Sequence, residues 1–179
     1  MKDHKRDLLK QIGVTKKVGE LDIYEWDDIA IKKNLSEEFI REFQKYLDWV
    51  HISKFQKLSI DFIREFIDKI SWHFIWRYQV LPEDFIREFE LEVRWTDVSK
   101  FQQLTDDFII EFKDKIRLKE YFYNQEASFY IMKKFVLFTN IKTIKNIKTS
   151  RLTNNQKQTI HKMLELKYMF EDKRPLKVK

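Results

Sequence analysis

Hydrophobic positions in residues 35–126 follow a helical spacing that restarts every 23 residues. In the first copy, Phe39, Ile40, Phe43 and Leu47 stand at i, i+1, i+4 and i+8, which lines one face of an α-helix. The four copies begin at Leu35, Leu58, Leu81 and Leu104. The pattern predicts that the first half of each copy is one helix, which extends to the fourth apolar position (Leu47 in the first copy).

A helix start signal precedes each of these apolar stripes. Hydroxyl residues occupy the cap position in three copies, at Ser36, Ser59 and Thr105. A side chain there can accept a hydrogen bond from a free backbone N–H. Pro82 takes the same position in the third copy and suits a first helical turn.

The second half of each copy predicts a shorter helical segment with one apolar edge. Trp49, Ile52 and Phe55 are spaced by three in the first copy, whereas a strand would need a period of two. A single long helix would rotate the stripe by about 140° between copies, so no coiled-coil seam forms. We therefore predict an all-α fold, a compact α-solenoid of stacked helix–turn–helix repeats whose core comes from stacking.

Partial copies flank the array and predict atypical capping helices at both ends. We call the first and second halves of each copy its opening and closing halves. Residues 24–34 match a closing half, and a short helix from Asp7 to Ile12 is expected before them. Ile131 and Phe135 fit a fifth opening helix, and Thr153 caps a C-terminal helix. The expected parts are residues 1–34, residues 35–126 and residues 127–179.

Composition narrows the function classes. The chain has no cysteine, which excludes disulfides, cysteine metal sites and a cysteine nucleophile. Its start is charged and unlike a signal peptide, and residues 127–138 form too short and too charged a run to span a bilayer. We expect a soluble intracellular protein without a transmembrane segment.

Several polar columns recur, and each allows a structural and a functional interpretation. One column holds Glu42, Glu65, Glu88 and Glu111, and another holds Gln56, Gln79, Gln102 and Gln125. They could form ladders that bind a ligand, but partners in neighbouring repeats explain them better, since buried polar groups need partners. The tryptophan column, Trp49, Trp72 and Trp95, is better explained by core packing than by a stacking platform for bases.

The arginine column predicts pairs along one helix face. Arg41, Arg64 and Arg87 each follow an acidic residue by three positions, and Ile110 breaks the column. The four histidines do not converge with other ligands in sequence, and no catalytic triad, phosphate loop or HExxH pattern occurs. We expect no enzyme activity, no metal and no cofactor.

The C-terminal third is basic and is the first candidate contact surface. Residues 127–179 hold 13 basic and three acidic side chains, while the rest of the chain has a net charge of −4. Its candidate contact residues are Lys142, Lys145, Lys148 and Arg151. They could neutralise phosphates of nucleic acid, or balance the acidic array.

A second candidate surface is the pair of columns that vary most between repeats. One column holds His51, Phe74, Asp97 and Glu120, and its neighbour holds Val50, His73, Thr96 and Lys119. We expect both columns to be exposed, as a partner-specific surface would be. We also expect Phe89 to be a core residue whose truncation to alanine costs about 3–5 kcal/mol.

The unit LSEEFIREFQKYLDWVHISKFQK resembles a short repeat of proteins from large and giant DNA viruses, with the pattern L-S-x-D/E-F-I-R-E-F…D-W-x-x-I-S-x-x-Q. The resemblance covers the four copies and a half copy before them. It implies a viral origin and a helical repeat, but no catalytic residues. It favours a non-enzymatic module that binds a host or viral protein, or alternatively a minor capsid or core component of the virion.

Overall fold

The computed structural model describes residues 2–139, 145 and 147–172. Within these residues every regular element is a helix and no strand occurs. Helices pack against their neighbours in sequence order, which confirms the predicted all-α solenoid of helix–turn–helix repeats. The chain forms two compact units, residues 1–85 and residues 86–179.

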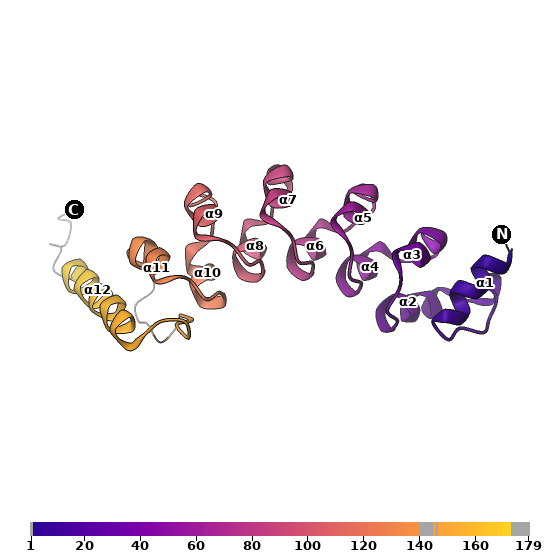
Figure 1. Ribbon diagram of the computed structural model, residues 1–179, viewed down its shortest axis with the longest axis horizontal. Helices are drawn as coiled ribbons and strands as arrows, with labels where there is room; N and C mark the ends of the chain where they lie inside the picture. The colour runs from indigo at the N-terminus through magenta and orange to yellow at the C-terminus, as the bar shows by residue number, and fades with distance from the viewer. Residues whose placement is uncertain (1, 140–144, 146, 173–179) are drawn as a thin grey trace, which may run out of the picture. The chain divides into compact units, whose positions relative to one another are not determined.

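The first unit contains the helices that precede the third repeat. They are α1 (Lys2–Gln11), the 3₁₀ turn η1 (Val18–Glu20), α2 (Ile23–Lys32), α3 (Glu37–Phe43), α4 (Trp49–Phe55), α5 (Ile60–Glu65) and α6 (Trp72–Tyr78). The closing helices form a row in which α2 packs on α4 and α4 packs on α6, while the opening helices α3 and α5 form the other row (Figure 1). Helix α7 (Glu83–Glu88) spans the boundary between the units.

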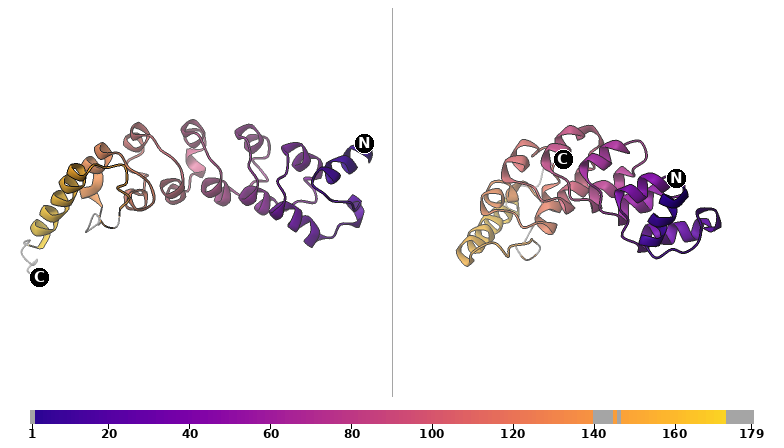
Figure 2. Two further views of the ribbon diagram at one scale, coloured as in Figure 1. Left: turned by 60° about the horizontal axis from the view of Figure 1, so that its bottom comes forward. Right: turned by 45° about the vertical axis from the view of Figure 1, so that its right-hand side comes forward.

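The second unit continues the same alternation. It contains η2 (Glu90–Glu92), α8 (Trp95–Phe101), α9 (Asp106–Glu111), α10 (Leu118–Asn124), α11 (Phe129–Phe135), η3 (Val136–Phe138) and α12 (Asn154–Asp172). Closing helix α8 packs on α10, opening helix α9 packs on α11, and α12 packs on α11 and η3. Figure 2 shows the order of the helices along each unit from two further directions.

Side-chain hydroxyl caps explain where four opening helices start, α3, α5, α9 and α11. Ser36 and Ser59 accept the N–H of the residue three positions on, each at 3.1 Å, and Thr105 does so at 3.3 Å. Ser128 starts α11 in the same way, at 3.1 Å. The caps predicted from the sequence are therefore confirmed, and α11 is the expected fifth opening helix.

The opening helices are shorter than predicted. Helix α3 ends at Phe43, and Leu47, the fourth residue of its apolar stripe, lies in the following turn with 5% of its surface exposed. The turn is closed by a hydrogen bond from the N–H of Tyr46 to the carbonyl of Phe43 at 2.9 Å. Tertiary burial, and not helical continuity, therefore accounts for the apolar fourth position.

The apolar columns predicted for the opening helices are buried, except at two residues of the third copy, Phe89 and Val93 (the latter in the column of Leu47), which are half-buried. Phe39, Phe62, Phe85 and Phe108 are at most 1% exposed. Phe43, Phe66 and Phe112 are also buried, but Phe89 is only half-buried. Phe89 lies at the start of the 3₁₀ turn η2, and the expected 3–5 kcal/mol for its truncation is therefore too large.

Both ends are capped by helices that differ from the repeats. Helix α1 begins at Lys2, earlier than the predicted Asp7, and Gly13 ends it with a φ of +77° and an N–H bonded to the carbonyl of Lys10 at 2.9 Å. Thr153 caps α12 by accepting the N–H of Gln156 at 3.3 Å. Ile141, Ile144 and Ile147 are spaced by three in the sequence, as in the second half of a repeat; Ile141 and Ile144 lie outside the described residues, and Ile147 is 6% exposed.

Candidate functional site

The recurring glutamines tie neighbouring repeats together through the backbone. Gln56 is 3% exposed, and its Oε1 accepts the N–H of Leu35 at 2.9 Å. Its Nε2 donates to the carbonyls of Ala30 at 2.7 Å and Lys33 at 2.8 Å, at the end of α2. Gln79 makes the same three bonds one repeat later, to Leu58, Ser53 and Gln56. The amides of Gln56 and Gln79 are therefore structural, and both are occupied by backbone groups.

Two of the recurring glutamates, Glu65 and Glu111, pair with arginines of the preceding repeat. Arg41 contacts both carboxylate oxygens of Glu65, with Nε at 2.8 and 3.0 Å and Nη2 at 2.7 Å. These hydrogen bonds lower the pKa of Glu65. The guanidinium also lies 4.9 Å from the ring centre of Phe62. Arg87 and Glu111 repeat the pair in the second unit, at 2.9 Å between Nη2 and Oε2.

The predicted i,i+3 pairs describe the arginine column only in part. Arg64 does lie 3.3 Å from Asp61, three residues before it. For Arg41, by contrast, the partner along its own helix is Glu37 at 3.7 Å, and the shorter bonds go to Glu65 of the next repeat. The stacking of one repeat on the next brings the Glu65 carboxylate beside the Arg41 guanidinium. Helical periodicity within a single helix cannot predict this contact.

At the first and last copies of the glutamate and arginine columns, the ion-pair partners are different residues. Glu42, in the first full repeat, pairs with Lys5 of α1 at 2.9 Å, and Lys5 lowers the pKa of Glu42 through this bond. At the other end, Ile110 replaces the arginine, and the position 24 residues on holds Lys134 in place of a glutamate. An arginine at 110 would face a like charge, so the two replacements go together.

The tryptophans are half-buried links between repeats. Trp49 lies 4.8 Å from Phe66 and 6.3 Å from Phe62, measured between ring centres, and both phenylalanines belong to the next repeat. Trp95 makes the equivalent contacts with Phe112 at 5.1 Å and Phe108 at 6.5 Å. The packing interpretation is confirmed, although part of each indole reaches solvent.

The apolar edge predicted for the closing helices is wrong at its last position. Phe55, Tyr78 and Phe101 are 43%, 45% and 42% exposed. Six residues along an α-helix amount to about 240° of rotation, so a residue at i+6 leaves the buried face. In the first unit this produces an aromatic face, which we define as Val50, Lys54 and Phe55 of α4 with Phe74 and Tyr78 of α6.

Lys54 lies at the centre of the aromatic face. Its Nζ is 4.7 Å from the ring centre of Phe55, 5.7 Å from Phe74 and 5.9 Å from Tyr78. Phe74 and Tyr78 lie one turn apart on α6, 5.9 Å between ring centres. Val50 is 42% exposed and lies one turn before Lys54, so the apolar surface continues along α4.

The candidate column of His51, Phe74, Asp97 and Glu120 is not uniformly exposed. His51, Phe74 and Glu120 are half-buried, and Glu120 pairs with Lys100 at 3.1 Å. Asp97 is 6% exposed, which contradicts the expected exposure. Its carboxylate lies 2.9 Å from Nε of Arg94, the residue before α8, so a buried charge at this position has a cationic partner.

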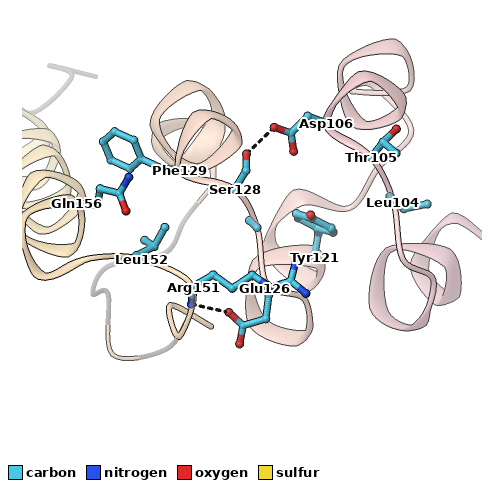
Figure 3. Close-up of a pocket in the computed structure, with 11 residues that line it drawn as sticks. Leu104, Thr105, Asp106, Tyr121, Glu126, Ser128, Phe129, Arg151, Leu152 and Gln156 are labelled. Atoms are coloured by element: carbon cyan, nitrogen blue, oxygen red, sulfur yellow. Dashed lines mark hydrogen bonds between the residues drawn. The ribbon is translucent and has the colours of Figure 1, made fainter.

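The basic candidates of the C-terminal third are exposed where they are described. Lys145, Lys148 and Arg151 are exposed, and Lys142 lies outside the described residues. Lys148 and Arg151 line a cleft of about 450 Å³ together with Tyr121 and Glu126. Figure 3 shows the adjoining pocket of about 370 Å³, which Arg151, Tyr121 and Glu126 line as well.

Acidic groups lie in this cleft and in the adjoining pocket: Glu126 lines both, and Asp106 lines the pocket. The N–H of Arg151 donates to Glu126 at 3.4 Å, and Asp106 accepts the hydroxyl of Ser128 at 2.6 Å (Figure 3). A hydrogen bond from Ser150, supported by Arg151, lowers the pKa of Glu126. The cleft therefore holds the carboxylate of Glu126 beside the cations of Lys148 and Arg151, and its surface is not purely cationic.

Tyr121, which lines the cleft, makes the stability of the fold depend on pH in the alkaline range. The residue is 3% exposed, and burial, together with the charge of Asp106, raises its pKa to about 12. An unfolded tyrosine has a pKa of about 10. The contribution of Tyr121 to stability is therefore complete below about pH 10 and is lost as the pH rises towards 12.

We expect Tyr121→Phe to flatten the fall of stability between about pH 10 and pH 12, because the variant has no buried phenol to ionise on unfolding. Urea unfolding at several alkaline pH values measures this slope. Tyr24→Phe, at a tyrosine that is 78% exposed, controls for the number of phenols. Equal slopes for Tyr121→Phe and wild type would contradict the assigned cause.

Comparison with protein-family models, with curated protein sequences and with solved structures gives no match to this chain. No helix in the described part of the chain combines the length and the apolar character that crossing a membrane requires. The functional argument therefore rests on how the chain arranges its own residues.

Proposed function

We propose that this chain is a non-enzymatic helical-repeat module that binds a protein partner through the aromatic face. The partner is expected to present an extended or helical segment with apolar side chains and at least one carboxylate. The observation that carries the proposal is the position of Lys54 among three partly exposed rings.

Composition supports a protein partner for this face. Aromatic side chains are enriched at the centres of protein interfaces and supply much of their binding energy. A surface that leaves 43% of Phe55 and 45% of Tyr78 in water gains free energy when a partner covers it. The rings restrict water around the ammonium of Lys54, so a carboxylate of the partner would meet a partly desolvated cation.

The other repeated polar columns are less suited to a partner. The described glutamine amides bond backbone groups, and Glu65 and Glu111 bond arginines. In the second unit, Lys100, which corresponds to Lys54, pairs with Glu120. The aromatic face combines exposed rings with Lys54, and the contacts described for the Lys54 ammonium are with those rings. We place the partner there for this reason.

Two alternatives remain as outcomes of the test. Nucleic-acid binding would use Lys145, Lys148 and Arg151, and it would weaken steeply with salt. A virion component of viral origin, located in the host cytoplasm or in the particle, rests on the sequence resemblance alone. Recovery of capsid or core proteins with the purified chain would favour that role.

The test is affinity capture of the tagged chain from the cells that express it, with nuclease added, followed by measurement of the purified partner's affinity. The surface variant combines Lys54→Glu, Phe55→Ser and Tyr78→Ser. Its matched control combines Val80→Ser and Leu91→Ser, since these side chains are 92% and 99% exposed outside the aromatic face. A second variant reverses the charges of Lys145, Lys148 and Arg151.

We expect the surface variant to weaken partner binding by at least tenfold and the Val80/Leu91 control to change it by less than about twofold. Circular dichroism confirms that each variant is folded. Binding that survives the surface variant overturns the proposal. Binding that nuclease or the C-terminal charge reversal abolishes would assign the function to the basic third instead.

A further inference from the structure

Three potential metal ligands come together where the degenerate first repeat meets the first full repeat. Asp27 lies on α2, Asp48 is the N-cap of α4, and His51 is in the first turn of α4. One donor atom from each residue lies within 4.8 Å of the other two. In sequence, Asp48 and His51 are three residues apart, and only the packing of α2 on α4 adds Asp27.

The imidazole of His51 turns its Nδ1 inward, towards these carboxylates. Nδ1 is buried and has no hydrogen-bond partner among the described residues. It lies 3.4 Å from Oδ1 of Asp27, close enough for an ion pair but without the alignment of a hydrogen bond. A buried ring nitrogen without a partner is costly, and a bound cation would remove that cost.

We propose that Asp27, Asp48 and His51 bind a divalent transition-metal ion of the Zn²⁺ class. Two ligands about 2.0–2.1 Å from a tetrahedral ion stand about 3.3–3.4 Å apart, which matches the separation of Nδ1 and Oδ1. Oδ1 of Asp48 already accepts the N–H of Val50 at 2.6 Å, which leaves its second oxygen for the metal. One imidazole and two carboxylates suit Zn²⁺, Co²⁺ or Ni²⁺, with water in the open position.

The residues 23 positions later in the chain, at the next joint between repeats, provide a comparison for this site. At the next joint the corresponding residues are Val50, Ser71 and Phe74, which cannot ligate a metal as a set. Each ligand can therefore be replaced by the residue that the next repeat uses in the same surroundings. The resulting variants are Asp27→Val, Asp48→Ser and His51→Phe, and serine is the residue that precedes α6 at the equivalent position.

The test is isothermal titration of the untagged chain with ZnCl₂, repeated with Co²⁺ to record visible absorption. Asp28→Asn is the matched control, because Asp28 is the neighbouring carboxylate on α2 and pairs with Lys32 at 2.8 Å. The absence of cysteine means that thiolates do not compete for the ion. The readouts do not depend on the aromatic face, so the result is separate from the test of partner binding.

We expect one ion per chain with a Kd below about 100 µM, and a loss of at least tenfold in Asp27→Val and in His51→Phe. Asp28→Asn should stay within about twofold of wild type. No saturable binding by the wild-type chain overturns the proposal. So does unchanged binding by a folded Asp27→Val or His51→Phe chain, since the ion would then bind elsewhere.

Discussion

Replacing Phe62 by alanine is expected to lower the free energy of unfolding by about 3–5 kcal/mol, the range for a fully buried phenylalanine. Phe62 is 0% exposed, and its ring centre lies 4.6 Å from that of Phe66 and 4.9 Å from the guanidinium of Arg41. Truncation leaves a cavity between two repeats and removes both contacts. Urea unfolding followed by circular dichroism measures the loss.

Phe89→Ala is the matched comparison for this prediction. Phe89 belongs to a recurring phenylalanine column but is only half-buried, so its truncation should cost about 1–2 kcal/mol. A cost for Phe89→Ala as large as that for Phe62→Ala would show that burial does not rank these positions. An unchanged stability of Phe62→Ala would contradict the assigned core.

Replacing Gln56 by alanine is expected to cost about 2–4 kcal/mol. The variant loses three hydrogen bonds and leaves the N–H of Leu35 and the carbonyls of Ala30 and Lys33 without this partner. A buried polar group without a partner costs about 1–3 kcal/mol. The same unfolding assay gives the value.

The isosteric variant Gln56→Glu separates hydrogen bonding from packing. It keeps the size and the acceptor oxygen, but a carboxylate cannot donate to the two carbonyls. We expect it to be at least as unstable as Gln56→Ala. Gln103→Ala, at an exposed glutamine, should change stability by less than about 0.5 kcal/mol. A stable Gln56→Glu protein would show that packing alone maintains this joint.

The sequence predicted the repeat architecture because one signal is written four times. Cap residues such as Ser36 and apolar pairs such as Phe39 and Ile40 appear in every copy or nearly every copy. Each of these signals depends only on residues within a few positions of one another in the sequence. The prediction was less accurate at element ends. Leu47 fits a helical stripe in sequence, yet burial alone accounts for it in the turn after α3.

The sequence predicted much less of the candidate sites, because these depend on which residues of different repeats meet. The bond between Arg41 and Glu65 spans 24 positions, whereas periodicity within one helix favours partners three or four positions away. Asp97 fell in a variable column and is nevertheless buried beside Arg94. The approach of Asp27 to His51 likewise requires the packing of α2 on α4.

A recurrence in the sequence marks the aromatic face, but the sequence predicts a buried column where the structure has an exposed one. Phe55, Tyr78 and Phe101 repeat at one column, which suggests core packing when columns are counted by threes. The helix turns this column away from the buried face, and 42–45% of each side chain reaches solvent. Recurrence indicates a shared role, while the rotation of the helix decides whether that role is internal or external.

The most direct measurement of the central claim is hydroxyl-radical footprinting of the chain with and without its captured partner. The proposed function predicts that Phe55, Phe74 and Tyr78 become protected when the partner binds. Tyr24 and Phe138, which are 78% and 81% exposed outside the aromatic face, should keep their reactivity. Unchanged oxidation of Phe55, Phe74 and Tyr78 in the complex would contradict the proposal that the aromatic face binds the partner.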